Sequence, residues 1–180
     1  MTLRVGQGYD AHAFAPISER RPLILGGVQI APAGGLAGHS DADVLTHAIA
    51  DALLGAARLG DIGQYFPDDD PTWQNADSQD LLRRVAALLE QQGYKILDID
   101  SVIVAEKPRM SPWYTTMREQ LAATLQLPVN AVGVKATSTD GLGAIGRGEG
   151  IAASAVALLE IGDELAAANR IAREPGGFSH

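Results

Sequence analysis

His39-Ser-Asp-Ala-Asp43-Val-Leu-Thr-His47 opens the stretch of sequence that decides how this chain folds. Residues 41–59 form a run rich in alanine and leucine, and Gly60 follows it. Ser40 and Asp43 have the spacing of a capping box, which predicts that a helix begins just before Asp43. Gly60 is a typical residue at which such a helix ends. The run therefore predicts one long helix near the middle of the fold.

A second short cluster, Asp10-Ala-His12, lies near the start of the chain. Side chains two residues apart point to the same face of an extended segment. The predicted helix presents Asp43, His47 and Asp51 in one stripe, because they are four residues apart. One carboxylate and two imidazoles from these elements would give the three-ligand zinc site that leaves a position open for substrate. Spacing alone leaves a second interpretation open, in which these are surface histidines and capping aspartates.

The composition indicates a globular protein of one domain. The chain has 180 residues, of which 46% are hydrophobic and 20% charged. Its N-terminus lacks a signal-peptide layout, and no apolar run approaches the ~18 residues of a membrane span. The absence of cysteine excludes disulfides and thiolate ligands. A net charge of −8 argues against broad nucleic-acid binding. We therefore expect a cytoplasmic protein (or a plastid one, if processed from a precursor) that binds neither nucleic acid nor membrane.

Strands and helices are predicted to alternate along the chain. Gly26-Gly27 indicates a bulge or bend within one predicted strand. This order favours an α/β (α+β) single domain with helices packed on one face of a small mixed sheet. The predicted strands are 3–9, 22–30, 96–105 and 132–137, and the predicted helices are 41–59, 77–93, 112–125 and 149–168, the last followed by a frayed tail.

Gly141-Leu-Gly143-Ala-Ile-Gly146 matches the G-x-G-x-x-G pattern of dinucleotide-binding proteins. A Rossmann unit needs a second parallel strand after the helix that follows this pattern. The predicted helix over 149–168 leaves no room for such a strand, so we expect no nicotinamide or flavin site. The glycines still allow the backbone to approach a phosphate closely.

Ten short motifs occur in an order that resembles the 2-C-methyl-D-erythritol 2,4-cyclodiphosphate synthase family of the non-mevalonate isoprenoid pathway. Each motif is weak by itself, and it is their common order over residues 4–159 that carries the resemblance. The motifs are Arg4-Val-Gly-Gln-Gly-Tyr-Asp-Ala-His12, Leu25-Gly-Gly27, His39-Ser-Asp-Ala-Asp43, Asp51-Ala-Leu-Leu-Gly55, Leu59-Gly-Asp-Ile-Gly63, Phe66-Pro-Asp68, Asp77-Ser78, Met117-Arg118, Val134-Lys-Ala-Thr-Ser-Thr139 and Gly146-Arg-Gly-Glu-Gly-Ile151.

The resemblance implies an intramolecular phosphoryl transfer. The 2-phosphate of a cytidine-diphosphate-linked methylerythritol attacks the β-phosphate, closes a cyclic diphosphate and releases CMP. Such a reaction chiefly needs two phosphates held together, because the nucleophile is already an anionic oxygen. By resemblance Asp10, His12 and His47 are the zinc ligands. Asp51 would orient a ligand imidazole or, equally, be a solvated helix residue.

The resemblance also implies which residues contact substrate. His39 and Ser138 would stabilise the developing charge, and the loop 66–70 would cover the sugar held by Asp61. Arg147 would lie near the phosphate or at a subunit contact. The substrate-binding set is Asp10, Ala11, His12, His39, Ser40, Asp61, Ile62, Gly63, Phe66, Pro67, Asp68, Asp69, Asp70, Thr137, Ser138, Thr139, Asp140, Ala144 and Arg147; the nucleotide pocket is Ala105, Pro108, Arg109, Met110, Ser111, Ala136 and Thr137.

The loop after residue 137 departs from the family pattern. Threonine is usual where this chain has Ser138, and glutamate is usual at Asp140. The family's glutamate binds a second divalent ion, Mg²⁺ or Mn²⁺, and Asp140 keeps an oxygen donor on a shorter side chain. Ala144 replaces an aromatic residue near the trimer axis, which would enlarge an apolar cavity there.

The resemblance implies a homotrimer with active sites between subunits and a catalytic domain over residues 1–162. Residues 163–180 lie outside the match. Two other functions stay open: a zinc phosphohydrolase that uses water as nucleophile, and a non-enzymatic module that binds a nucleotide or an isoprenoid diphosphate.

Overall fold

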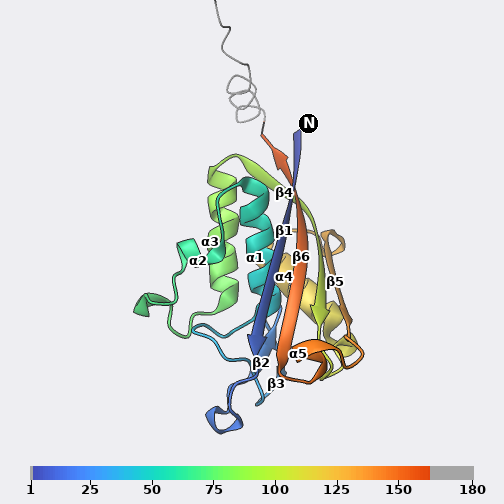
Figure 1. Ribbon diagram of the computed structural model, residues 1–180. Helices are drawn as coiled ribbons and strands as arrows, with labels where there is room; N and C mark the ends of the chain where they lie inside the picture. Colours follow the sequence, from blue (N-terminus) through green and yellow to red (C-terminus); the bar gives the residue numbers. More distant parts are fainter. Residues whose placement is uncertain (1, 163–180) are drawn as a thin grey trace, which may run out of the picture.

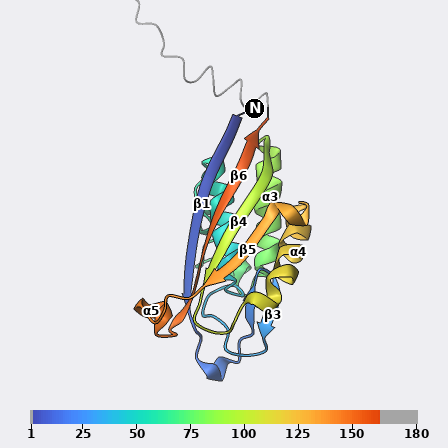
Figure 2. The same ribbon diagram turned by 90° about the vertical axis from the view of Figure 1, so that its right-hand side faces the viewer.

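A four-stranded sheet covered on one face by three helices makes up the part of the chain that this computed structural model describes, residues 2–162 (Figures 1 and 2). The strand order is β1-β6-β4-β5. β6 runs antiparallel to both of its neighbours, whereas β4 and β5 are parallel, so the sheet is mixed as predicted. The strands are β1 (Thr2–Ala13), β4 (Tyr94–Val104), β5 (Val132–Thr137) and β6 (Gly150–Ile161), and the covering helices are α1 (Val44–Ala57), α3 (Ser78–Gln91) and α4 (Tyr114–Leu125).

Shorter elements gather at the lower end of the sheet in Figure 1 or project from its sides. The expected strand over 22–30 is a hairpin, because Gly26 and Gly27 both have positive φ and form its turn. Among residues 2–162, no helix combines the length and apolar character needed to cross a membrane. The short elements are β2 (Leu23–Leu25), β3 (Val28–Ala31), α2 (Ile62–Tyr65) and α5 (Gly143–Gly146), together with 3-10 turns at Ile17–Glu19, Pro71–Trp73, Ser111–Trp113 and Val129–Ala131.

The helix α1 is the central element of the core, and almost all of its residues are buried. Its alanines allow it to lie very close to β1. A Cβ atom added to Gly8 would lie 2.0 Å from the carbonyl oxygen of Ala48, and one added to Gly6 would lie 2.1 Å from that of Ala52. Because real Cβ contacts are essentially never shorter than 3.0 Å, only glycine permits this packing.

The prediction of a helix over 149–168 is wrong for its described part, because residues 150–161 form the strand β6 between β1 and β4. Its alanine-rich sequence has high intrinsic helix propensity. In the fold, however, burial alternates: Ile151, Ala153 and Ala155 are buried, whereas Ser154 and Val156 on the other face are more accessible. Small side chains suit this strand because α1 packs directly on it. The remainder of the predicted helix lies outside the described residues.

The helix predicted to begin at residue 41 begins three residues later, at Val44, and its N-cap is Asp43, not the Ser40 that the capping-box spacing indicated. The carboxylate of Asp43 accepts hydrogen bonds from the backbone of Thr46 and also from the N–H groups of Gly26 and Gly27. Asp43 therefore joins the β2–β3 turn to α1 and does not belong to a stripe of candidate ligands. The helix predicted over 77–93 begins at Ser78, and Asp77 is its cap, because the Asp77 side chain accepts from the N–H of Gln79.

Candidate active site

Three side chains converge where β1 passes the start of α1. Asp10 and His12 extend from the same face of β1, as their spacing predicts, and His47 extends from the first turns of α1. The Oδ2 atom of Asp10 lies 3.1 Å from Nε2 of His12 and 3.0 Å from Nδ1 of His47. One donor atom of each residue lies within 4.8 Å of the other two. The structure therefore brings together the strand and helix residues that the sequence could not show to meet.

The donor set suits a divalent cation. The Nδ1 atom of His12 lies 2.7 Å from the carbonyl oxygen of Ala37, which can only accept, so Nδ1 donates there and Nε2 is the nitrogen that faces the cluster. Burial alone would raise the pKa of Asp10, but hydrogen bonds from His12 and His47 outweigh it and hold that pKa well below its usual range. The hydrogen bond to Asp10 raises the pKa of His12. One carboxylate and two imidazoles in this arrangement match a catalytic zinc site with an open position.

A cavity of about 220 Å³ opens onto this cluster. Nε2 of His39 is buried without a hydrogen-bond partner among the described residues, so it remains available to an anion in the cavity. The N–H of Thr46, in the first turn of α1, is not free for an anion, because the carboxylate of Asp43 accepts from it. The lining residues are Asp10, His12, Gly38, His39, Ser40, His47, Ile62, Gly63, Phe66, Asp68, Trp73 and Leu81.

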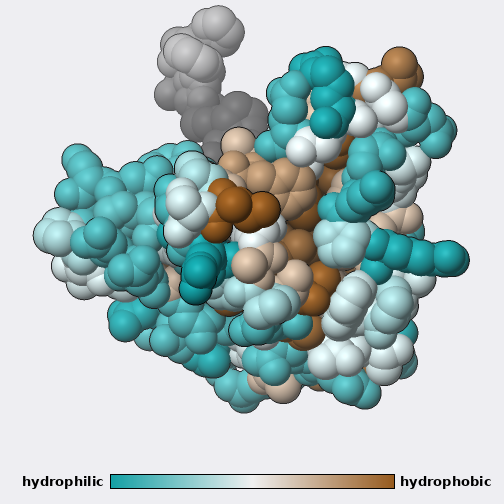
Figure 3. Space-filling view, turned by 90° about the horizontal axis from the view of Figure 1, so that it is seen from below, coloured by the Kyte–Doolittle hydropathy of each residue, from teal (hydrophilic) through white to brown (hydrophobic). Residues whose placement is uncertain are grey.

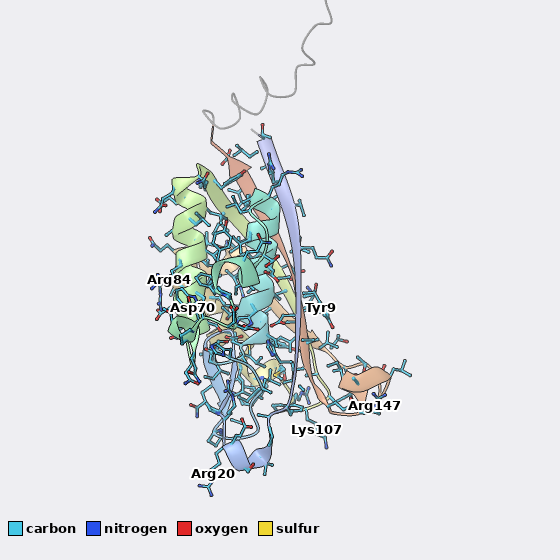
Figure 4. All side chains as sticks on the ribbon, turned by 60° about the vertical axis from the view of Figure 1, so that its left-hand side comes forward. Tyr9, Arg20, Asp70, Arg84, Lys107 and Arg147 are labelled. Carbon is cyan, nitrogen blue, oxygen red and sulfur yellow. The ribbon has the colours of Figure 1, made fainter. Side chains whose placement is uncertain are left out.

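The acidic loop after α1 borders this cavity through some of its predicted residues. Phe66 packs edge-on against Trp73, with ring centroids 4.9 Å apart, and Arg84 of α3 lies over the same indole. Figure 4 shows Arg84 and Asp70 on this side of the molecule. Asp61 is the N-cap of α2, where its carboxylate accepts from the backbone and side chain of Gln64. Asp61, Pro67, Asp69 and Asp70 do not line the cavity.

Asp51, predicted to orient a ligand imidazole, makes a different hydrogen bond. Its Oδ1 atom accepts from the backbone N–H of Ile62 at 2.7 Å, so it fixes the start of α2 below the cavity. Nε2 of His47 instead lies 2.9 Å from Oγ of Ser78, at the first residue of α3. The sequence places Ser78 only at a helix start, and its occurrence in the Asp77-Ser78 motif is the one signal of a further role.

A second cavity, of about 460 Å³, lies where the parallel strands β4 and β5 end. All seven residues predicted for the nucleotide pocket line it. Glu106, which lies in the same segment between Ala105 and Pro108, lines the cavity beside them. The lining residues are Ala105, Glu106, Pro108, Arg109, Met110, Ser111, Tyr114, Ala136, Thr137 and Ser138.

The loop that follows β5 is held by Glu106. Its Oε1 atom accepts from the N–H and hydroxyl of Thr139 at 2.9 and 3.1 Å, and from the N–H of Gly141 at 3.4 Å. The hydroxyl of Ser138 donates to Oδ1 of Asp140, whose φ of +52° places it in a tight turn. Asp140 and Ser138 thus lie together at the mouth of the second cavity, exposed to solvent. Their hydroxyl and carboxylate can meet a phosphate and its counter-ion.

Arg147 and Ala144 lie away from both cavities in this chain. Arg147 is exposed and pairs with Glu149 at 2.6 Å. Ala144 is exposed on α5, which projects from the lower end of the sheet. Figure 4 shows Arg147 on the opposite side of the molecule from Asp70. The predicted substrate contacts of these two residues therefore do not join the others within one chain.

The two cavities lie at the same end of the sheet and at opposite edges of it. Register places His12 beside Ile151, and Val104 beside both Ala152 and Thr137, so β1, β4 and β5 end at one level. Figure 3 views this end, where apolar side chains form a band between polar surfaces. Since β6 and β4 separate the two edge strands, β1 and β5 lie roughly 14 Å apart, which is three strand spacings. Within residues 2–162, no residue lines both cavities.

Comparison with known proteins identifies the family. A model described as the YgbB family matches residues 3–160. A protein from Thermosynechococcus vestitus named 2-C-methyl-D-erythritol 2,4-cyclodiphosphate synthase is 56% identical over 90% of this chain and 99% of its own length. This chain belongs to that family. A synthase of the same name from Chlorobaculum tepidum is 54% identical over 88% of this chain. The resemblance carried by the ordered motifs is therefore confirmed.

Solved structures of the family share the fold. The bifunctional IspDF of Campylobacter jejuni superposes with a TM-score of 0.85 at 41% identity, covering 89% of this chain and 42% of that one. The IspF of Plasmodium falciparum, solved as a CDP complex, superposes with a TM-score of 0.77 at 31% identity, covering 89% of this chain and 97% of its own. The G-x-G-x-x-G pattern thus belongs to a fold in which the strand after it is antiparallel, unlike a Rossmann unit.

Proposed function

We propose that this enzyme converts 4-diphosphocytidyl-2-C-methyl-D-erythritol 2-phosphate to 2-C-methyl-D-erythritol 2,4-cyclodiphosphate and CMP. The observation that supports it most directly is the convergence of Asp10, His12 and His47 at a cavity of a chain that belongs to this family. In the reaction, a 2-phosphate oxygen forms a bond to the β-phosphorus. The bond from that phosphorus to the CMP phosphate oxygen breaks, and no water is consumed.

The residues of the first cavity would hold the reacting phosphates. Zinc, held by Asp10, His12 and His47, would supply a Lewis acid that polarises a phosphate oxygen. His39 offers its unpartnered Nε2 to a second oxygen of the same group, where negative charge develops. Because the nucleophile is already ionised, the site needs orientation more than a general base. Backbone groups of exposed Gly63 and the carbonyl of half-buried Ile62, beside Asp61, would orient the sugar hydroxyls.

The second cavity would bind the cytidine diphosphate. Its backbone groups at the ends of β4 and β5 can pair with the edge of a base, and Arg109 can meet a phosphate. The hydroxyl of Ser138 would contact the diphosphate, and Asp140 would hold the second divalent ion, Mg²⁺ or Mn²⁺. We assign these roles within residues 1–162.

A single chain cannot bring these two cavities to one substrate across the width of the sheet, and we therefore propose a homotrimer with sites between subunits. The open face of the sheet supports this assembly. Val5 and Tyr9 of β1 and Val156 of β6 are exposed there, at 68%, 62% and 44%. Figure 4 shows Tyr9 pointing away from the helices. An apolar sheet face of this kind is typical of an interface between copies.

Two measurements test the proposal. Phosphorus NMR of the products, with the reaction run in ¹⁸O-labelled water, should show the cyclic diphosphate without the label; a labelled, acyclic product would identify a phosphohydrolase. Tight diphosphate binding with no product at all would instead identify a binding module.

Subunit complementation tests the shared site. His47→Ala removes a metal ligand in the first cavity, the metal half of the shared site. Ser138→Ala removes a diphosphate contact in the second cavity, the nucleotide half. Each variant alone should be nearly inactive. Dissociated and reassembled in equal amounts, they should form mixed trimers in which about a quarter of the sites combine two intact halves. Activity no higher than that of the separate variants would contradict a site shared between subunits.

A further inference from the structure

His47 has a partner at each nitrogen of its ring, and only one of these nitrogens faces the cluster. Nδ1 lies 3.0 Å from Oδ2 of Asp10, and Nε2 lies 2.9 Å from Oγ of Ser78. A neutral imidazole carries its proton on one nitrogen and binds a metal through the other. The tautomer of His47 therefore decides whether this side chain can be a ligand.

The hydroxyl of Ser78 is committed to a carboxylate. The backbone N–H of Ser78 donates to Oδ2 of Asp41 at 3.0 Å, and its hydroxyl donates to Oδ1 of the same residue. An ionised carboxylate can only accept hydrogen bonds. With its single proton directed to Asp41, Oγ of Ser78 can only accept from the imidazole of His47. Nε2 must therefore carry a proton. Nδ1, which can donate to the carboxylate of Asp10 in the metal-free protein, is the nitrogen left to bind a metal.

We propose that Asp41 and Ser78 are positioning residues that fix His47 in the Nε2–H tautomer and so direct the lone pair of Nδ1 at the metal. This inference rests on the proposed metal site. The negative charge of Asp41 also polarises the Ser78 hydroxyl, which accepts from Nε2–H of His47. This makes the imidazole a better electron donor to the metal, as carboxylate partners of ligand histidines do.

Burial protects the chain of hydrogen bonds from His47 through Ser78 to Asp41, which we call the relay. Ser78 is fully buried, and the His47 side chain is 13% exposed, so water cannot readily replace a wrong hydrogen bond. The hydroxyl of Ser40 is a weaker competitor for Nε2, because it lies at 3.3 Å and accepts from the N–H of Ala42. Asp41 also accepts from the N–H of Asp43 at 3.3 Å, which holds its carboxylate in place beside the start of α1.

Asp41→Asn should reverse the direction of the hydrogen bonds in the relay, with little change in side-chain size. If the amide oxygen keeps the bond from the Ser78 N–H, the amide NH₂ faces Oγ of Ser78. The hydroxyl must then turn to donate to Nε2 of His47, which moves the imidazole proton to Nδ1. We expect zinc affinity, measured by competition with a chromogenic chelator, to fall by roughly 10–100-fold. Long-range ¹H–¹⁵N spectra of the metal-free protein should show Nε2 of His47 protonated in the unmodified chain and unprotonated in Asp41→Asn.

Asp77→Ala is the matched control at the same helix end. It removes the cap of α3, which accepts from Gln79, and leaves Asp41 and Ser78 in place. It should lower Tm and leave both zinc affinity and the His47 tautomer unchanged. Ser78→Ala repeats the test through the middle of the relay if Asp41→Asn does not fold.

Two results would overturn the proposal: an unchanged tautomer with undiminished zinc affinity in Asp41→Asn, or an equal loss of zinc affinity in Asp77→Ala. Failure of the metal site itself gives a different result. In that case the unmodified protein and His12→Ala would bind zinc equally, while the spectrum of the metal-free protein would still report the tautomer of His47.

Discussion

Replacing Gly8 with alanine should damage the metal site without touching a ligand. The new Cβ would lie 2.0 Å from the carbonyl oxygen of Ala48, so α1 would have to retreat by about 1.4 Å to restore an ordinary contact of 3.4 Å. Asp10 and His12 lie on β1 and His47 lies on α1, so this retreat separates the ligands. Metal–ligand distances tolerate only about 0.2 Å. Zinc affinity should therefore fall by at least the roughly 10–100-fold that loss of an orienting contact costs.

The same change should also destabilise the fold. Overpacking a core contact costs about 1–3 kcal/mol, and here the obstructing atoms are backbone, which cannot move aside as a side chain can. Urea unfolding followed by circular dichroism measures the free energy of unfolding, and chelator competition measures zinc affinity on the folded protein.

Gly55→Ala is the matched control within α1. A Cβ at Gly55 would meet only the carbonyl oxygen of Gln7, at 3.8 Å, which is an ordinary contact. Because alanine favours a helix interior over glycine, this variant should be more stable by up to about 1 kcal/mol and bind zinc normally. Unchanged stability and zinc affinity in Gly8→Ala would refute the close packing of α1 on β1. Equal zinc losses in both variants would refute the link between that packing and the metal site.

Four further changes test individual roles. His47→Ala should yield a folded protein that retains zinc poorly, and undiminished zinc by metal analysis would contradict its assignment as a ligand. Asp61→Ala should weaken substrate binding by about 1.5–3 kcal/mol while CMP affinity in calorimetry stays unchanged; equal losses would refute its assignment to the sugar alone. Asp140→Asn should raise the Mg²⁺ or Mn²⁺ concentration for half-maximal turnover at constant zinc content, and superimposable titrations would remove Asp140 as a ligand. Hydrogen bonds from backbone N–H groups of the 138–141 loop lower the pKa of Glu106, so its hold on that loop is complete above the ordinary glutamate pKa of 4.5 and is lost as pH falls through the lowered value. The NMR chemical shifts of the loop's backbone amides should change with pH in that range. The same shifts should not change there in Glu106→Gln.

Local patterns determined much of the site. The two-residue spacing of Asp10 and His12 fixed their common face, because side chains alternate along any strand. Asp77 capped α3 as its residue type predicts, since a short carboxylate satisfies the free N–H groups of a helix start. The residues predicted around the base, such as Ala105 and Thr137, meet in one cavity because they end two adjacent parallel strands.

The tertiary structure decided what depends on partners distant in sequence. Residues 150–161 became a strand because β1 and β4 pair with both of their edges and α1 requires small side chains beneath it, and these contacts override alanine's preference for a helix. Ser78 contacts His47, and Glu106 contacts Thr139. Each pair is separated by more than 30 residues in the sequence, so no local spacing could reveal either contact. The sequence by itself determined which side chains are chemically able to bind a metal or a phosphate, because residue type sets what a side chain can donate or bind. Their distribution over two cavities at opposite edges of the sheet was decided by strand order, which is set by packing of the whole domain.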